Sequence, residues 1–506
     1  MKYDILIKNG KIIDGTGKPG FFADVAIKGK TIAKVGQNIE NQEASCVIDA
    51  SGLVVSPGFI DVHCHTDWSI LDGPWDDHQE MQGITTQVAG LCGTSPLSPE
   101  EHFRDVLQET GLRTNYALMV GHGTVRKSVM GDAERAPLPD ELRKMKYLTE
   151  KALDEGALGL STGLIYVPGT YSTTEELKEL ASVLRRYDGV YATHMRSESD
   201  AILKAVDEAI EVACHADVRL QISHIKVILP RNWGLGPEVI KRLEAAMKNI
   251  PVAADQYPYT VTGGGLYGPS RLVKGWPVQE QQSAEDKESR ALAQFQRDFR
   301  YAEKREELVS HVRSLLEDRG GPKQFIIVKA KTQRIVGMRL DEASRALDIP
   351  AEILCLEEIA ASEGQFAMVY EGVYEPEMIE FMKKPWVMVG TDGVPGAFHP
   401  RTHGTFPRLL GRYVREKNVL PLEEAIRKMT SLPAETFGFP GRGRIAEGFY
   451  ADLVVFDPDT IIDRADFVQP HVYPEGIKWV FVNGTAVVRE GRPVEVYPGV
   501  PLRRES

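Results

Sequence analysis

Short apolar runs recur along the middle of the chain, and stretches with helical periodicity separate most of them. The runs are rich in β-branched residues, and turn signals bound them, so they predict strands. Residues 175–186 and 201–214 instead repeat apolar positions at intervals of three and four, which is typical of an amphipathic helix. We find eight strand-like runs: 54–65, 86–92, 116–122, 157–162, 190–194, 218–224, 251–257 and 386–392.

Strands that alternate with helices predict parallel strands joined by right-handed crossovers. Eight such units favour an α/β protein with a (β/α)8, TIM-like barrel over residues 55–437. In barrels of this kind the active site is built at the carboxyl ends of the strands. Candidate chemistry is therefore expected at those strand ends.

The two ends of the chain have a different pattern, with short strand signals and turns. Asn9-Gly10 and Asn483-Gly484 each lie between apolar runs, which is a strong hairpin signal. We therefore expect residues 1–54 and 438–506 to form one small β-domain built from both ends. Residues 263–347 interrupt the eight-unit rhythm, and this inserted subdomain is either an active-site lid or a solvated helical decoration.

The composition narrows the class of protein. The chain has 506 residues, of which 42% are hydrophobic, and a formal charge of −12. Such a chain can bury a large core, and its negative charge offers no basic footprint for nucleic acid or anionic lipid. No apolar run reaches the length of a membrane span, and five scattered cysteines argue against a disulfide framework. We expect a cytoplasmic protein that acts on a small molecule, without nucleic-acid or membrane partners; the oligomeric state stays open.

Reactive side chains gather at the ends of the predicted strands. His63 and His65 are two positions apart in the first strand, so both point to the same side and can reach one metal ion. Taken alone, the pair could equally be two histidines on a polar strand face. Similar residue types at other strand ends favour a metal site. The candidate ligands are His63, His65, Cys92, His194, His224 and Asp392.

Each candidate also has an ordinary structural explanation. A buried cysteine usually packs as a small hydrophobic side chain, and His194 and His224 could be core histidines with satisfied hydrogen bonds. Asp392 could simply cap a turn before Gly393. His122 also follows a strand, but we expect it in a loop or in support of the ligands rather than among them.

The candidate ligands suit zinc. Imidazole and thiolate are ligands that zinc prefers, and a thiolate can bridge two zinc ions. Bound zinc lowers the pKa of water to roughly 7. Asp392 could take a proton from the attacking water and later give it to a departing amine. The predicted chemistry is zinc-dependent hydrolysis of an amide.

With these residues placed, the chain resembles the amidohydrolase superfamily and, within it, the N-acyl-D-amino-acid deacylases, or D-aminoacylases. The resemblance covers nearly the whole chain. Its most specific parts are the cysteine after the second strand, SHIK at 223–226, YPY at 257–259 and HPRTHGTFPR at 399–408. It implies removal of the acyl group from an N-acyl-D-amino acid, and the preference for the D-enantiomer rests on the resemblance alone.

The same resemblance implies roles for individual residues. Cys92 would take the bridging role that many amidohydrolases give to a carboxylated lysine on strand four, because residues 159–163 contain no lysine. One zinc ion would be held tightly by Cys92, His194 and His224. A weaker second site would use His63, His65, Cys92 and Asp392. The substrate carboxylate would be bound by Lys226, Tyr257 and Arg401, and Tyr166 would line the pocket.

Two other functions remain open at this point. A cyclic-amide hydrolase of the dihydroorotase or hydantoinase type is the first, although such relatives usually carry the lysine that strand four lacks. The second is a metal-free relative that keeps the barrel for assembly. Nothing in a scaffold requires this set of ligands at strand ends, so we expect an enzyme.

Overall fold

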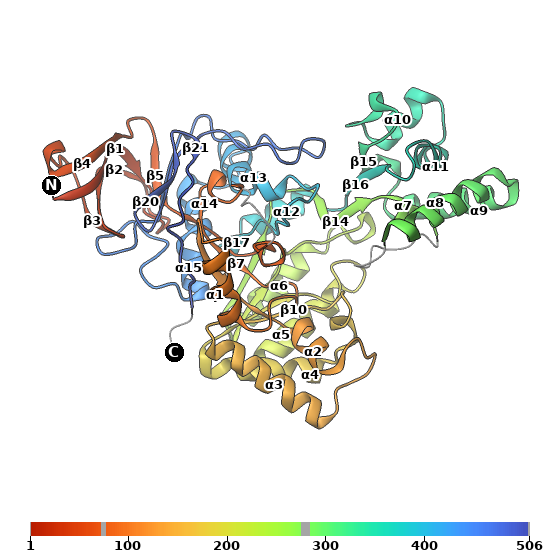
Figure 1. Cartoon of the computed structure of the whole chain (residues 1–506), viewed down its shortest axis with the longest axis horizontal. Helices are drawn as coiled ribbons and strands as arrows, with labels where there is room; N and C mark the ends of the chain where they lie inside the picture. Colours follow the sequence, from red (N-terminus) through yellow and green to blue (C-terminus); the bar gives the residue numbers. More distant parts are fainter. Residues whose placement is uncertain (1, 72–76, 275–283, 504–506) are drawn as a thin grey trace.

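The computed structural model of the chain describes residues 2–71, 77–274 and 284–503 (Figure 1). Its strands form four sheets. Two of these contain the parallel strands of the central region, one joins the two ends of the chain, and one belongs to an insertion.

All eight predicted runs contain strands, and these strands pair in parallel in chain order. One sheet has the order β6–β7–β8, and the other has the order β9–β10–β11–β12–β13–β17. The strands are β6 (Phe59–Asp61), β7 (Ile84–Ala89), β8 (Asn115–Leu118), β9 (Val120–Gly121), β10 (Gly159–Gly163), β11 (Val190–His194), β12 (Arg219–Ile222), β13 (Val252–Gln256) and β17 (Val387–Val389). The third predicted strand is divided at Met119 into β8 and β9, and Met119 N donates to Ala89 O at 2.9 Å.

The first and last of these strands also meet. Asp392 N donates a hydrogen bond to His63 O at 2.7 Å, and His65 N donates to Gly393 O at 2.8 Å. Both bonds lie just beyond the carboxyl ends of β6 and β17. The residues that follow these two strands are therefore held side by side, although they are more than three hundred positions apart in the sequence.

Helices connect the parallel strands, and α5 illustrates why they form. Its apolar positions Ile202, Val206 and Val212 are fully buried in the core that includes β11 and β12. Burial of each such side chain stabilises the fold by roughly 1.5–3 kcal/mol. The connecting helices are α1 (Pro99–Glu109), α2 (His122–Met130), α3 (Pro139–Asp154), α4 (Thr174–Ala181), α5 (Ile202–Ala216) and α6 (Gly236–Ala246). The helices that flank β17 in the sequence are α12 (Glu375–Met382), α13 (Arg401–Arg408), α14 (Leu422–Met429) and α15 (Ser431–Phe437).

The nine-stranded sheet contains strands from both ends of the chain. Its order is β21–β20–β19–β18–β5–β1–β2–β3, with β4 paired to β1. Its strands are β1 (Tyr3–Ile12), β2 (Phe21–Lys28), β3 (Thr31–Gly36), β4 (Ala44–Asp49), β5 (Val54–Pro57), β18 (Leu453–Phe456), β19 (Ile477–Val482), β20 (Thr485–Arg489) and β21 (Arg492–Pro493). Figure 1 shows the red N-terminal strands beside the blue C-terminal ones, and antiparallel pairing of β5 with β18 joins the two sets.

The first predicted strand serves two sheets rather than one. The run 54–65 is broken at Gly58, so that β5 pairs in the nine-stranded sheet and β6 pairs with β7. Gly58 N donates to Asp452 O at 2.8 Å, and a Cβ at Gly58 would lie 2.1 Å from Thr85 Oγ1. The close approach of Thr85 requires glycine at the point where the chain passes from one sheet to the other.

The two Asn-Gly pairs behave differently. Asn483-Gly484 forms the predicted hairpin between β19 and β20, with φ values of 47° and 79°. The hairpin predicted at Asn9-Gly10 is wrong, because β1 continues through this pair with an irregular register between Ile7 and Gly10. A Cβ at Gly10 would lie 2.5 Å from Val55 Cγ2, so this glycine admits the neighbouring β5 instead of turning the chain.

A three-stranded antiparallel sheet is inserted between β13 and β17. Its order is β14–β16–β15, so β16 (Ala367–Glu371) is the central strand and the sheet extends past Leu347, the expected end of the insertion. Its other elements are β14 (Val261–Tyr267), α7 (Pro269–Leu272), α8 (Ala284–Arg300), α9 (Ala302–Asp318), β15 (Phe325–Lys329), α10 (Leu340–Leu347) and α11 (Ala351–Ala361). Phe325, Cys355 and Met368 belong to a separate core here, and Figure 1 shows this unit projecting from the rest. Residues 275–283 of the expected insertion lie outside the described residues.

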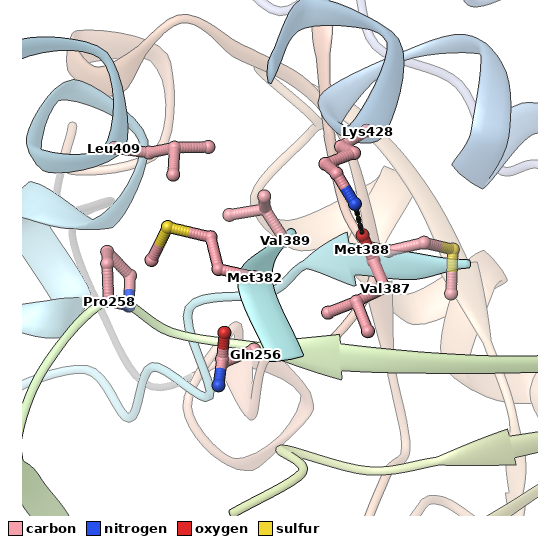
Figure 2. Close-up of a pocket in the computed structure, with 8 residues that line it drawn as sticks. All are labelled: Gln256, Pro258, Met382, Val387, Met388, Val389, Leu409 and Lys428. Carbon is pink, nitrogen blue, oxygen red and sulfur yellow. Dashed lines mark hydrogen bonds between the residues drawn. The ribbon is translucent and has the colours of Figure 1, made fainter. Parts of the chain in front are cut away.

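A cavity of about 10 Å³ lies beside β17, between this strand and side chains such as Met382 and Leu409 (Figure 2). Its volume is close to the minimum that one water molecule needs. Lys428 of α14 reaches this cavity, and its Nζ donates to Val387 O at 3.0 Å. Burial lowers the pKa of Lys428 to about 7. This lysine supports the start of β17.

Two further findings concern the expectations about membranes and disulfides. Within residues 2–71, 77–274 and 284–503, no helix combines the length and the apolar character that crossing a membrane requires. All five cysteines are free thiols, and Cys64, Cys92 and Cys355 are buried.

Candidate metal centre and active site

The six predicted ligands come together at the carboxyl ends of the parallel strands. We call them the ligand cluster: His63, His65, Cys92, His194, His224 and Asp392. Cys92 Sγ is at their centre, 3.4 Å from His63 Nε2, 3.5 Å from His224 Nε2 and 3.7 Å from His194 Nδ1. Asp392 Oδ1 lies 3.2 Å from His65 Nε2 and 3.6 Å from His63 Nε2.

The backbone at this cluster is strained. Cys92, His224 and Asp392 all adopt positive φ values, of 52°, 38° and 47°, which side chains other than glycine rarely adopt. Such strain persists only where the surrounding structure holds it, and it concentrates at functional sites. A Cβ at Gly163 would lie 2.0 Å from Cys92 O, so the end of β10 must be glycine for the cysteine loop to pack there.

The donor set fits a metal ion. His63, Cys92 and His224 can place one ligand atom each within 4.8 Å of one another, and so can His63, His65 and Asp392. These two groups share His63. A third group of this kind contains His194, Glu198 and His224. Imidazole nitrogens, a thiolate and a carboxylate that converge in this way match the ligands that zinc prefers.

The electrostatics favour the ligand forms of the cysteine and the aspartate. Burial by itself would raise the pKa of the Cys92 thiol, but His63 and His224 outweigh it and hold this pKa well below its usual value. Burial would also raise the pKa of Asp392, yet the nearby Arg401 guanidinium and His224 hold it well below the ordinary range. Cys92 is thus favoured as a thiolate, the form that binds metals, and Asp392 as a carboxylate.

Two carboxylates that the sequence did not single out contact histidines of the ligand cluster. Asp255, at the end of β13, places Oδ1 at 3.1 Å from His63 Nδ1 and accepts a hydrogen bond from His224 N at 2.8 Å. Glu198 places Oε1 at 2.9 Å from His224 Nδ1 and also binds Lys226 Nζ. Both acids lie far in the sequence from the histidines that they contact, so no local pattern signalled these contacts.

The predicted substrate-binding residues border the cluster, and two of them already have acidic partners. Lys226 Nζ binds Glu198 and lies 3.0 Å from His224 Nδ1. Arg401, the first residue of α13, places Nη1 at 2.5 Å from Asp392 Oδ2. Tyr257 lies between these cations, since Lys226 Nζ and Arg401 Cζ are 5.6 Å and 4.6 Å from its ring centroid.

Two half-exposed aromatic side chains flank the histidines. The Tyr166 ring, predicted to line the pocket, lies 5.0 Å from the His194 ring. The exposed fraction of Tyr166 is 49%. Trp68, which the sequence analysis did not single out, lies 4.5 Å from the His65 ring. The sequence signal that could have identified Trp68 is its position three residues after His65, a predicted ligand.

His122 is not in a loop, and its ring binds a carboxylate outside the ligand cluster. It begins α2 and is fully buried, with Nε2 at 2.9 Å from Glu176 Oε1. Glu176 Oε2 also accepts from Arg126 Nη1 at 2.7 Å, and Arg126 Nη2 donates to Ala133 O and Arg135 O. We call His122, Arg126 and Glu176 the His122 cluster.

A family model described as the amidohydrolase family matches residues 46–293 and 364–494. The chain belongs to the amidohydrolase family. It is 34% identical over 529 residues to a D-aminoacylase of Alcaligenes xylosoxydans xylosoxydans, which covers 100% of this chain and 98% of that protein. An N-acyl-D-glutamate deacylase of the same organism is 34% identical over 540 residues, covering 100% and 97%.

A solved structure is similar over the same extent. The crystal structure of N-acyl-D-glutamate deacylase from Bordetella bronchiseptica, complexed with zinc and a phosphonate inhibitor, has a TM-score of 0.80 and 31% identity to this amidohydrolase. The match covers 99% of this chain and 100% of that one. The resemblance to N-acyl-D-amino-acid deacylases is therefore confirmed, and the fold is the amidohydrolase fold of the TIM-barrel type.

Proposed function

We propose that this amidohydrolase is a zinc-dependent deacylase that removes the acyl group from N-acyl-D-amino acids. The observation that carries the proposal is the convergence of Cys92 with histidines from three strands beside Asp392. The end-to-end similarity to a D-aminoacylase and to an N-acyl-D-glutamate deacylase supports this substrate class over a cyclic amide. In the reaction, water adds its oxygen to the carbonyl carbon and the C–N bond breaks. The products are a carboxylate and a free D-amino acid.

We assign the ligands as the resemblance implies. Cys92, His194 and His224 would hold one zinc ion tightly, and His63, His65, Cys92 and Asp392 would form a weaker site. The distances from Cys92 Sγ to three imidazole nitrogens support its place between the two sites. When bound, zinc supplies Lewis acidity, which polarises a carbonyl group and makes water easier to deprotonate.

Asp392 is the proposed general base and acid. Its pKa is held below the ordinary range, so the carboxylate is ionised at neutral pH and ready to accept a proton. The proton comes from the attacking water, and Asp392 then delivers it to the departing nitrogen. Backbone hydrogen bonds to the segment that follows β6 hold this carboxylate beside His63 and His65.

The substrate carboxylate is assigned to Lys226, Tyr257 and Arg401. Both cations are nearly buried, and the hydroxyl of Tyr257 has no hydrogen-bond partner among the described residues. A guanidinium can bind a carboxylate through two parallel hydrogen bonds. Arg401 Nη1 already binds Asp392, so a substrate would use the other N–H groups of this side chain.

The finer architecture is also part of the proposal. The hydrogen bonds between the ends of β6 and β17 support closure of a (β/α)8 barrel over residues 55–437. Pairing of β5 with β18 supports one small β-domain from residues 1–54 and 438–506. We propose that the insertion reaches residue 371 rather than 347, since β16 is its central strand. Five free cysteines are consistent with the cytoplasmic location that we propose.

One experiment tests this function directly. The purified protein is loaded with zinc and given N-acetyl-D-amino acids, their L-enantiomers, and dihydropyrimidines and hydantoins. We expect turnover of the D-series with about one tightly bound zinc per chain. Turnover of the cyclic amides alone would replace the proposal with the cyclic-amide alternative. A protein without bound metal or hydrolysis of any of these compounds would favour the scaffold alternative.

A further inference from the structure

Glu198 lies behind the ligand cluster, at a position that none of the proposed ligand or substrate roles uses. It follows β11 by four residues, and only 10% of its side-chain surface is exposed. Its carbonyl oxygen accepts from Ile228 N at 2.9 Å, which fixes the backbone of this segment against the chain that follows His224. The carboxylate is therefore held at a defined place beside His224 and Lys226.

The two ring nitrogens of His224 face different partners. Nε2 points to Cys92 Sγ at 3.5 Å, on the side of the ligand cluster. Nδ1 faces Glu198 Oε1 at 2.9 Å and Lys226 Nζ at 3.0 Å. A neutral imidazole carries one proton, so one nitrogen donates and the other accepts.

Metal ligation by Nε2 decides which nitrogen carries that proton. A nitrogen that binds a metal ion has no hydrogen, so Nδ1 must be the N–H group and must find an acceptor. The Lys226 ammonium has only donors and cannot serve. Of the two groups at Nδ1, the Glu198 carboxylate alone can accept this hydrogen bond.

We infer that Glu198 is a positioning residue with two linked tasks. It accepts the Nδ1–H of His224, which fixes the tautomer in which Nε2 is free to bind zinc. The same carboxylate also binds Lys226 Nζ and so holds this ammonium group, which donates to His224 O at 3.0 Å, within 5.6 Å of the ring centroid of Tyr257. The second task rests on the substrate-binding role proposed for Lys226.

Asp255 provides an internal comparison within the same cluster. Its Oδ1 meets His63 Nδ1 at 3.1 Å, as Glu198 meets His224, but Gln221 Nε2 and the backbone N–H of His224 fill its other contacts. These partners are neutral, whereas the partner of Glu198 is a lysine ammonium. Glu198 therefore joins a ligand histidine to a cation at the substrate side, which Asp255 does not.

The test measures zinc affinity, which requires no turnover. Full-length wild type, Glu198→Gln and the control Glu208→Gln are depleted of metal, and zinc is titrated against a chromophoric chelator. Glu208 is a suitable control because it is a partly buried acid paired with Arg196, with Nε and Oε2 3.0 Å apart, in the same region of the molecule. We expect Glu198→Gln to bind zinc about 10–100-fold more weakly, the usual effect of losing a carboxylate behind a ligand histidine. Glu208→Gln should bind zinc as wild type does.

The variant Lys226→Met distinguishes two roles of Glu198: fixing the tautomer of His224 and neutralising the charge of Lys226. If Glu198 acts through His224, then Glu198→Gln combined with Lys226→Met should bind zinc as weakly as Glu198→Gln alone. Recovery of wild-type affinity in the double variant would mean that Glu198 merely neutralises Lys226, and would overturn the inference. Unchanged zinc affinity in Glu198→Gln would overturn it as well.

Two further measurements keep the inference testable. If Glu198→Gln does not fold, Glu198→Asp keeps the charge but is one methylene shorter, and we expect it to weaken zinc binding by a smaller factor; equal affinity to wild type would count against the inference. In the folded variants, the ratio of KM for an N-acyl-D-amino acid to KM for its amide analogue should rise when Glu198 is changed. If wild type hydrolyses neither compound, the proposed function fails, while the zinc titration still decides the role of Glu198.

Discussion

The ligand cluster and the His122 cluster both bury histidine beside carboxylate, yet their charges are balanced in different ways. In the His122 cluster, Glu176 accepts hydrogen bonds from His122 and Arg126, and the guanidinium also binds two carbonyl groups. In the ligand cluster, three imidazole nitrogens face the single sulfur of Cys92. The first arrangement pairs its carboxylate with a guanidinium and an imidazole, whereas the second directs several potential metal-ligand atoms at one sulfur.

This difference shows why a histidine at a strand end is an incomplete signal. His122 follows β9 just as His194 ends β11, and both are buried. His122 begins a helix, so its side chain turns to α4 and Glu176 rather than to the neighbouring strand ends. A ligand is recognised by convergence with other donors, which position along the chain does not fix.

The largest effect is expected at the centre of the ligand cluster. Cys92→Ala removes the group that belongs to both proposed zinc sites, so bound zinc and turnover should be lost together. Elemental analysis and activity assays on the same preparation check this. Cys64→Ala is the matched control, because Cys64 is also buried and neighbours His63, but its sulfur contacts Thr66 and Val88 instead. Full zinc content and turnover in Cys92→Ala would contradict the place of Cys92 in both zinc sites, and with it the contrast between the two clusters.

The next effect concerns proton transfer within the ligand cluster. Asp392→Asn keeps the shape of the side chain but cannot act as a base, so turnover should fall by ~10²–10⁴-fold. Tightly bound zinc should remain, since Asp392 belongs to the weaker proposed site. Rates and zinc content measured together separate the two roles. Near-normal turnover would show that another group moves the proton.

A smaller effect is expected when the cation beside Asp392 is removed. Arg401→Ala should weaken binding of N-acyl amino acids by ~2–5 kcal/mol, and weaken their amide analogues far less. Arg401→Lys should restore binding only in part, because a point charge replaces a planar fork. Arg408→Ala is a matched control, because Arg408 lies in the same helix as Arg401. Arg408 also pairs with an aspartate, Asp463, and lies over a tyrosine ring, that of Tyr259. Equal losses for acid and amide would mean that Arg401 supports Asp392 rather than binding the substrate carboxylate.

The same variant makes a prediction about pH. Arg401 favours the ionised form of Asp392, so its removal should raise the pKa of that carboxyl. As the pH falls, the carboxylate is then protonated at a higher pH than in wild type. The acid side of the pH profile of kcat should therefore shift to higher pH in Arg401→Ala. An unshifted profile would separate Asp392 from the rate-limiting proton transfer.

The smallest effect on chemistry is expected in the His122 cluster, where the change should appear as lost stability. Glu176→Gln leaves the buried Arg126 without its counter-ion, which should lower the free energy of unfolding by ~3–5 kcal/mol. Denaturant unfolding measures this loss, and zinc content and kcat of the folded protein should stay at wild-type values. Loss of zinc in Glu176→Gln would erase the distinction between the two clusters.

The sequence by itself determined the order of strands and helices and the reactive residue types at the strand ends. Alternation of apolar runs and amphipathic stretches follows from burial, and parallel strands bring their carboxyl ends to one side. His63, His65 and Asp392 could therefore be grouped although the chain separates them widely. The helices predicted at 175–186 and 201–214 correspond to α4 and α5, whose periodic apolar positions face the core, although α4 ends at Ala181 and residues 182–187 continue as a 3-10 helix.

Tertiary structure alone decided which neighbours these residues meet. Gly10 admits a neighbouring strand rather than turning the chain, and Gly58 divides one apolar run between two sheets, because the approach of Val55 or Thr85 depends on the packed fold. Glu198 and Asp255 bind ligand histidines from other strands, and no local pattern encodes a contact between segments that only folding brings together. Side-chain direction at each strand end, and with it the difference between a ligand and a structural histidine, was set by these long-range contacts.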